Sequence, residues 1–345
     1  MSHGSLSKPA VQALSHGAAL SRCFLNTGEG GVSPYHLEGG CDIVYQLGTA
    51  KFGARNADAT LNEEKLRKIC ENPNIKMVEI KLSQGAKPGK GGILPSNKVT
   101  AEIAEIRGIE EGKSALSPNR HVDAGSAEEL LDLIHRIREA SGLPTGIKLC
   151  VGQVRPVIDL LKAIKERGDA AAPDYIVVDG GDGGTGAAPL PLIDNTGLTV
   201  RESLPLMDDL LTEFGLRERI KIIASGKLIT SADVAWAFCA GADMVNNARG
   251  FMFALGCIQA LKCDKNTCPT GITTHNPRLQ KGLDPANKAV RVHNYIKNII
   301  KEVEIIAHAC GVDEPRELQR EHLMIVQPSG RSKPFNQVWD RSRYH

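Results

Sequence analysis

A repeating unit constrains the fold of this chain more than any other feature of its sequence. In each repeat an apolar, β-type run leads into a glycine-rich loop, and a helical pattern of apolar residues follows. The runs lie at residues 75–82, 175–178, 220–224 and 242–245, and the helical patterns at 8–19, 127–140, 157–167 and 231–240. Because strands that alternate with helices pair in parallel, the repetition predicts an α/β fold built on a parallel sheet.

The number of candidate strands favours a closed sheet. Seven segments have strand character: 22–25, 75–81, 114–116, 146–150, 175–178, 220–224 and 243–245. Their spacing is typical of a TIM (β/α)8 barrel that lacks its first strand. Residues 1–7 have the character of a loop that follows a strand, so we expect a truncated chain or a coding sequence that begins upstream.

Composition limits the kind of ligand. The 345 residues include 42 basic and 40 acidic side chains, which leave a formal charge of +2, and there is no basic block. Nucleic acid and anionic membranes are therefore not expected as partners, and a small molecule is. The sequence has neither an apolar run of membrane-spanning length nor a secretory signal, which predicts a cytoplasmic location.

Three of the nine cysteines form a C-x5-C-x4-C run, Cys257, Cys263 and Cys268, that Pro269 closes. This spacing is typical of a metal site. Three thiolates are too few for a cluster with four cysteine ligands, and the run contains no histidine to complete a zinc site, so a three-iron cluster fits best. Disulfides to remote cysteines and three unrelated thiols are the alternatives.

Two glycine-containing loops follow the last two predicted strands, where barrels commonly hold phosphate. They are Ser225-Gly226-Lys227 and Asn247-Ala248-Arg249-Gly250. The backbone N–H groups of Gly226 and Gly250, with the charge of Arg249, suit a phosphate monoester. A tight turn at each place is equally compatible with the residues.

Four motifs in this order resemble the FMN-binding synthase domain of glutamate synthase: residues 26–31 (NTGEGG), 84–92 (QGAKPGKGG), 183–187 (GGTGA) and the cysteine run. Residues 247–259 look especially like stand-alone prokaryotic proteins related to that domain, which usually carry an additional N-terminal segment with the first strand. The resemblance extends over nearly the whole chain. It implies a barrel at 1–272 that carries the cluster loop, a helical extension at 273–312 and a polar tail at 313–345.

The resemblance implies FMN and a [3Fe–4S] cluster as cofactors, with electrons passing through the cluster to the flavin. Reduced flavin would then deliver hydride to 2-iminoglutarate, formed from 2-oxoglutarate and ammonia, to give L-glutamate. Lys148 matches the lysine beside the flavin, and its position between Ile147 and Leu149 on a strand directs it to the opposite side from both. Glu29, Lys87 and Arg107 match positions near the substrate, with Glu29 and Lys87 also matched as catalytic.

The residues implied to hold FMN are Ser2, Asn26, Gln84, Lys148, Asp179, Gly183, Gly184, Thr185, Ser225, Gly226, Lys227, Asn247, Arg249 and Gly250. Each charged candidate also has an ordinary structural interpretation. Lys148 could be a strand-end lysine in a salt bridge, Lys87 a solvated loop charge, and Arg107 a residue at the end of the helix predicted for 99–106.

The sequence departs from the family pattern in ways that bear on the reaction. Ile93 stands where the family has a glutamine that contacts substrate, which keeps open another 2-oxo acid or an amine, as in an enzyme of the N-methylglutamate synthase type. Residues 246–249 replace the glycine-threonine phosphate loop. Ser2 follows Met1, where complete glutamate synthases have a cysteine that releases ammonia from glutamine.

These departures predict partners. Ammonia would come from solution or from a glutaminase subunit. Because no G-x-G-x-x-G fingerprint follows a first strand, electrons would come from an NAD(P)H-oxidising protein or ferredoxin. A homo-oligomer is compatible with the sequence, and an inactive, truncated electron-transfer subunit is a further alternative. We expect a helix at 286–310, a hydrogen-bonding role for His275, and loose order from Pro328 onward.

Overall fold

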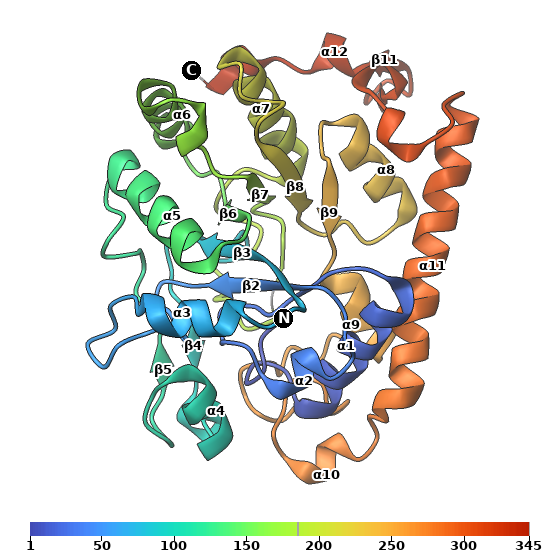
Figure 1. The fold of residues 1–345 in the computed structure, drawn as a ribbon. Helices are drawn as coiled ribbons and strands as arrows, with labels where there is room; N and C mark the ends of the chain where they lie inside the picture. Colours follow the sequence, from blue (N-terminus) through green and yellow to red (C-terminus); the bar gives the residue numbers. More distant parts are fainter. Residues whose placement is uncertain (185, 345) are drawn as a thin grey trace.

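The computed structural model describes residues 1–184 and 186–344. Its centre is a sheet of seven parallel strands whose order in space follows their order in the chain (Figure 1). The strands are β1 (Leu25–Asn26), β2 (Ile43–Leu47), β3 (Ile75–Lys81), β6 (Thr145–Leu149), β7 (Tyr175–Asp179), β8 (Lys221–Ser225) and β9 (Met244–Asn246). This is the order of a (β/α)8 barrel, and the predicted fold class is confirmed. In the described chain no strand joins β9 to β1.

Helices follow the strands and cover the outside of the sheet (Figure 1). They are α1 (Lys8–Ser21), α2 (Pro34–Leu37), α3 (Glu63–Cys70), α5 (Ala127–Ser141), α6 (Arg155–Arg167), α7 (Val200–Glu213), α8 (Ser231–Cys239) and α9 (Arg249–Leu255). Side-chain caps begin several of them: Ser7, Asn62 and Ser126 each accept an amide hydrogen bond in the first turn. The predicted apolar stripe of α5 is buried, because Leu130, Ile134 and Ile137 face the core.

One predicted strand lies outside the main sheet and one strand of that sheet was not predicted, so the expected number of seven strands was still right. Residues 114–116 do not join the main sheet: β5 (Ala115–Leu116) pairs antiparallel with β4 (Ile93–Leu94). The strand that sequence analysis overlooked is β2, whose five residues are all buried. Its polar member, Gln46, donates to Glu79 of β3 at 2.5 Å. The polar residue interrupts the apolar run, and only the partner on the next strand accounts for its burial.

The segment between β3 and β6 forms a small lobe with a core of its own. It contains β4, β5, a 3-10 turn η1 (Ser96–Lys98) and α4 (Ala101–Arg107) (Figure 1). Its core consists of Leu94, Val99, Ile103, Ala104 and Ala115, together with Ala50 and Phe52 from the loop after β2. The lobe carries Lys87 and Arg107, which are predicted substrate residues, and also Lys98.

The C-terminal residues return across the barrel. After α10 (Pro277–Gln280), α11 (Pro285–Ala309) runs along α1, α8 and α9 (Figure 1), so it links helices that flank both ends of the open sheet. The remaining elements are η3 (Pro315–Glu317), η4 (Arg320–His322), β10 (Met324–Val326), β11 (Ser332–Pro334), α12 (Phe335–Val338) and η5 (Arg341–Tyr344).

Part of the segment expected to be loosely ordered is instead fastened to α7. The indole N–H of Trp339 donates to Asp209 at 2.7 Å, and the Arg341 guanidinium pairs with Glu213 at 2.7 Å. Phe335 is buried. None of the described helices is long and apolar enough to cross a membrane.

Candidate active site

Asp179 joins three of the segments that sequence analysis singled out. It ends β7 and is buried, and it accepts hydrogen bonds from the Gly85 amide at 2.9 Å and from the Ser225 hydroxyl at 2.7 Å. The Lys148 ammonium lies 3.8 Å from the same carboxylate. Carboxyl ends of parallel strands meet at one edge of the sheet, and Asp179 fixes the loops after β3 and β8 relative to β6.

Lys148 carries its charge at the centre of this edge. Burial would lower the pKa of its ammonium, but the carboxylates of Asp179, Glu79 and Glu29 outweigh burial and raise the pKa above its ordinary value. Lys148 is therefore a permanently charged, mostly buried cation. The salt-bridge interpretation and the functional one are both compatible with this geometry.

Glu29 is the meeting point of the predicted substrate residues. The Lys81 ammonium lies 3.3 Å from its carboxylate, and Lys81 also donates to Gln84 at 3.0 Å. Burial would raise the pKa of Glu29, but Lys81, Lys87 and Arg107 together lower it. Lys87 and Arg107 thus lie near enough to Glu29 to favour its ionised form, and a role of the three residues in substrate binding stays a prediction.

Lys81 was not among the site residues predicted from the sequence. A signal was present, because Glu79 and Lys81 alternate along β3 and so point to the same side of the sheet. Space around Glu29 is tight: a Cβ added to Gly92 would lie 2.2 Å from Oε1 of Glu29, and one added to Gly48 would lie 2.7 Å from its Cβ. These glycines allow the loops to close over the carboxylate.

Arg107 lies inside the protein and not at a solvated helix end. It is 4% exposed, its Nη2 donates to the His3 carbonyl at 3.3 Å, and its guanidinium lies 5.0 Å from the Phe52 ring centre. Burial lowers the pKa of Arg107 to about 10, against the raising effect of Glu29. Its buried Nε has no hydrogen-bond acceptor among the described residues, so one donor of the fork is free for a ligand.

The predicted phosphate loops converge on Arg249. A Cβ added to Gly184 would lie 2.0 Å from Nη2 of Arg249, so the guanidinium rests directly on the glycine loop after β7. A Cβ on Gly183 would lie 3.4 Å from Cα of Gly226. The side chain of Arg249 forms neither a hydrogen bond nor an ion pair with the described residues. Thr185, between these glycines and Gly186, lies outside the described residues.

Other predicted phosphate ligands already have partners. The Gly250 amide donates to Asn247 Oδ1 at 2.9 Å, and Asn247 Nδ2 donates to the Tyr295 hydroxyl of α11 at 2.6 Å. The expectation of a free Gly250 N–H is therefore wrong, since Asn247 satisfies that group at the start of α9. Lys227 pairs with Asp194 at 2.7 Å.

Ser2 and Asn26 lie near the end of β1. The Ser2 hydroxyl donates to Ser5 at 2.9 Å, and Asn26 Oδ1 accepts from the Gly28 amide at 2.9 Å. Asn26 thus shapes the turn that leads to Glu29. A Cβ added to Gly30 would lie 2.9 Å from both Arg107 Nη2 and Ser2 Cβ, so this turn lies against Arg107 and Ser2.

The cysteine loop lies against the glycine loop after β7, since a Cβ on Gly186 would lie 2.7 Å from Sγ of Cys263. Three of its non-glycine residues, Gln259, Leu261 and Asn266, have left-handed backbone conformations, with φ of 56°, 52° and 59°. The Gln259 amide donates to Sγ of Cys257 at 3.4 Å. Left-handed residues turn backbone N–H groups toward one side, as in many iron–sulfur sites.

The thiols of this loop differ in acidity. Burial would raise the pKa of Cys268, but hydrogen bonds from Thr270 and Thr273 outweigh it and lower the pKa to about 7. In Cys263, burial prevails and the pKa is raised. All nine cysteines are free, which contradicts the disulfide alternative. Within the described chain, however, no three side chains of the metal-binding types already stand in a metal-holding arrangement. His275 hydrogen-bonds the Gly4 carbonyl at 2.8 Å, as expected.

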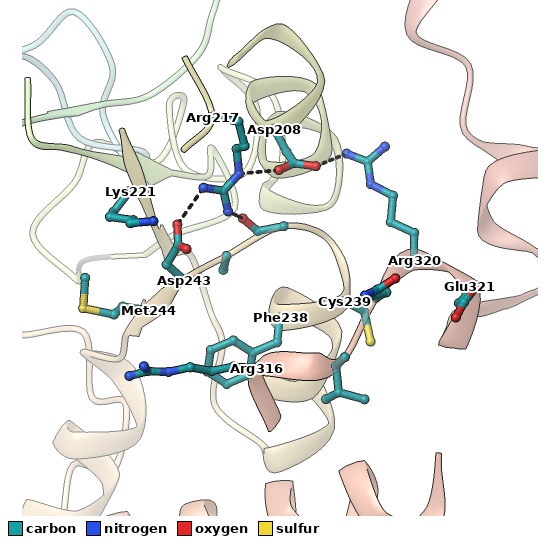
Figure 2. Close-up of a pocket in the computed structure, with 14 residues that line it drawn as sticks. Asp208, Arg217, Lys221, Phe238, Cys239, Asp243, Met244, Arg316, Arg320 and Glu321 are labelled. Atoms are coloured by element: carbon teal, nitrogen blue, oxygen red, sulfur yellow. Dashed lines mark hydrogen bonds and ion pairs between the residues drawn. The ribbon is translucent and has the colours of Figure 1, made fainter. Parts of the chain in front are cut away.

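A cavity of about 630 Å³ lies away from these residues (Figure 2). Lys221 begins β8 and Asp243 precedes β9, so the cavity lies at the amino ends of the strands. Arg217 crosses it to pair with Asp208 at 2.7 Å and Asp243 at 3.0 Å. None of the predicted site residues lines this cavity. In barrels, residues at the amino ends of the strands usually contribute to stability, and the ion pairs of Arg217 agree with such a role.

The chain matches the conserved region in glutamate synthase over residues 1–313. It belongs to the glutamate synthase family. A glutamate synthase large subunit-like protein, YerD, of Bacillus subtilis is 43% identical over 331 residues, which are 96% of this chain and 62% of that protein. An archaeal glutamate synthase [NADPH] of Methanocaldococcus jannaschii is 38% identical over 323 residues, 92% of this chain and 59% of that protein. The chain thus spans about three fifths of these relatives.

Solved structures share the fold at low sequence identity. A flavocytochrome b2 variant with pyruvate bound aligns with a TM-score of 0.54 and 16% identity, over 96% of this chain and 69% of that chain. A mandelate oxidase variant with a monooxide FMN adduct aligns with a TM-score of 0.51 and 13% identity, over 90% of this chain and 72% of that chain. These likenesses support the barrel architecture and no more.

Proposed function

We propose that this chain is an FMN-dependent glutamate-synthase-type oxidoreductase that converts 2-oxoglutarate and ammonia, through 2-iminoglutarate, to L-glutamate. The observation that carries the proposal is the convergence of Glu29, Lys81, Lys87 and Arg107 beside Lys148 at the carboxyl edge of the strands. In this proposal ammonia comes from solution or from a glutaminase subunit, and electrons come from an NAD(P)H-oxidising protein or ferredoxin.

The charges around Glu29 suit a dicarboxylate. Lys81, Lys87 and Arg107 surround one carboxylate, which leaves two positive charges in excess. The free Nε of Arg107 and the Lys87 ammonium would bind the two substrate carboxylates, because guanidinium and carboxylate match in shape. The Glu29 carboxylate would accept a hydrogen bond from the substrate nitrogen and orient it.

The residues at the carboxyl edge also suit FMN. Arg249, free of protein partners and lying on Gly184, would hold the phosphate with the loop at Gly183 and Gly226. Bound FMN would supply hydride for reduction of the imine. Lys148 would hold positive charge against the polar edge of the flavin ring, and Asp179 keeps that lysine in place.

Cys257, Cys263 and Cys268 would hold a [3Fe–4S] cluster. The low pKa of Cys268 supports thiolate ligation at neutral pH. The hydroxyl of Thr273 acts on both Cys263 and Cys268 and favours the thiolate form of each. Closure around the metal would draw the three sulfurs together, as metal binding commonly orders its own loop.

A second candidate reaction has a specific observation in its favour. Ile93 is 56% exposed and follows Gly92, which packs on Glu29. An exposed apolar side chain beside the predicted nitrogen site suits the alkyl group of an amine, and the product would then be an N-alkylglutamate. Ile93→Gln should shift the preference toward ammonia.

The test begins with anaerobic purification and analysis of flavin and iron. We expect one FMN and about three irons per chain. With a chemical reductant as electron source, 2-oxoglutarate consumption with ammonia supports the first reaction, and faster consumption with methylamine supports the second. If the protein binds FMN but its reduced flavin is oxidised neither by 2-oxoglutarate with ammonia nor by 2-oxoglutarate with methylamine, both proposed reactions are contradicted.

Arg249→Met should reduce FMN affinity by about 10–100-fold, since a charge-assisted contact to phosphate is lost. Gly184→Ala should have a similar effect, because its added Cβ displaces the guanidinium. Flavin fluorescence during titration of the apoprotein measures both. The matched control is Arg278→Met, an exposed arginine on α10. Unchanged affinity in both variants would remove Arg249 from the phosphate site.

Glu29→Gln should lower the free energy of unfolding by about 1–3 kcal/mol near neutral pH, because three cations lose their shared carboxylate. The pKa of Glu29 is depressed in the folded protein, so its contribution is present above the ordinary carboxyl pKa and is lost as pH falls through the depressed value. The difference between wild type and variant should therefore shrink on acidification. Urea unfolding at several pH values, with exposed Glu64→Gln as control, measures it.

A further inference from the structure

Lys98 is a buried cation that the proposed reaction leaves without a role. It ends η1 in the lobe between β3 and β6 and is 1% exposed. Its ammonium donates to the carbonyl of Ser5 at 3.0 Å and to the carbonyl of Cys263 at 3.1 Å. In the described chain it forms no ion pair with a carboxylate. Two carbonyl groups satisfy hydrogen bonds but bring no opposite charge.

A buried ammonium without a counter-charge is costly, and proteins normally pair it. The opposite charges that act most strongly on Lys98 belong to the thiols of Cys263 and Cys268, ahead of the carboxylate of Asp264. The other charged group facing it is Arg107, which is also positive. Because the Lys98 ammonium donates to the carbonyl of Cys263, a negatively charged group held by the cysteine loop would lie close to it.

The lobe holds the cysteine loop at a second point. Asn266 Nδ2 donates to the Asn97 carbonyl at 3.1 Å, next to Lys98. Asn266 in turn accepts from the Thr274 hydroxyl at 2.6 Å and from the His275 amide at 2.7 Å. The neutral Asn97–Asn266 contact can hold the loop without a charge, so fastening alone does not explain a buried ammonium at position 98.

We propose that Lys98 is a positioning residue that provides the positive counter-charge to an anionic iron–sulfur group held by Cys257, Cys263 and Cys268. The proposal rests on the cluster assigned under the proposed function. Lys98 does not ligate iron; it acts through the charge of its ammonium and through the backbone of Cys263. Because reduction adds negative charge to the cluster, a nearby cation favours the reduced form and raises the reduction potential.

Lys98→Met and Lys98→Gln remove the charge, and Gln keeps hydrogen-bonding capacity toward the two carbonyls. Both variants should lower the reduction potential of the cluster in a titration followed by electron paramagnetic resonance. Lys98→Arg keeps the charge, so its reduction potential should stay close to that of the wild type. Lys113→Met, an exposed lysine of the same lobe, is the matched control and should leave the potential unchanged.

The rate at which a chelator removes iron distinguishes a contact that only holds the cysteine loop in place from a charge that acts on the cluster. Asn266→Ala should release iron faster at an unchanged potential, whereas Lys98→Gln should change the potential more than the release rate. If Lys98→Met does not fold, the Gln variant carries the test. Iron-bearing Lys98→Gln with a wild-type potential would overturn the role of Lys98 alone. Iron-free wild type would overturn the cluster, and the counter-charge with it.

Discussion

Cys268→Ser should abolish iron binding. Hydrogen bonds lower the pKa of Cys268 to about 7, whereas burial raises the pKa of Cys263, so Cys268 ionises more readily than Cys263. Serine ionises far too weakly to replace it, and two remaining thiolates are too few for any common cluster. Iron content and visible absorbance measure the result, and we expect loss of all the iron.

The flavin should remain in that variant, because Arg249 and Gly184 do not depend on the cluster. Cys310→Ser is the matched control: Cys310 is exposed at the end of α11, outside the loop. Full iron content in Cys268→Ser would contradict the cluster assignment. Loss of iron together with flavin would instead mean that the cysteine loop supports the glycine loop that it touches at Gly186.

Lys148→Met should lower turnover by about 10²–10³-fold, the effect of removing one group that stabilises developing charge in a closed site. The ammonium lies among Asp179, Glu79 and Glu29, which keep it charged. Without it the reduced flavin loses its positive neighbour, so the flavin potential should also fall. Single-turnover kinetics and a flavin redox titration measure the two effects.

That variant should also lose some stability, because the buried carboxylates lose a neighbouring cation, although Asp179 keeps its hydrogen bonds from Gly85 and Ser225. Lys148→Arg should recover part of the activity. Lys221→Met is the control, because Lys221 begins β8 at the opposite end of the sheet. Wild-type turnover in Lys148→Met would remove Lys148 from the site and leave the salt bridge as its only role.

Much of the fold was readable from local pattern. The periodicity of α5 and the runs of β3, β7 and β8 follow from the burial of one face or of a whole strand, which the sequence records residue by residue. The failures had tertiary causes. β2 escaped because Gln46 is satisfied by Glu79 on another strand. Residues 115–116 have strand character, but they pair with β4 in the lobe.

The candidate site was likewise predictable only in part from the sequence. Family resemblance led to Glu29, Lys87, Arg107 and Lys148, and the loop after the last predicted strand led to Arg249. It did not show that the amide of Gly250 is satisfied by Asn247, or that Lys227 pairs with Asp194. Those outcomes depend on side-chain geometry that residue identity does not specify.

The sequence by itself determined the parallel α/β class, the barrel-type repeat and the kinship with glutamate synthase, because each is recorded in neighbouring residues. Only the tertiary structure decided which charges meet. Lys81 reaches Glu29 across 52 residues of chain, Gly85 reaches Asp179 across 94, and Lys98 reaches Cys263 across 165. Such contacts arise where strand ends and loops converge, and buried charges acquire their effect from neighbours that the linear sequence keeps far apart.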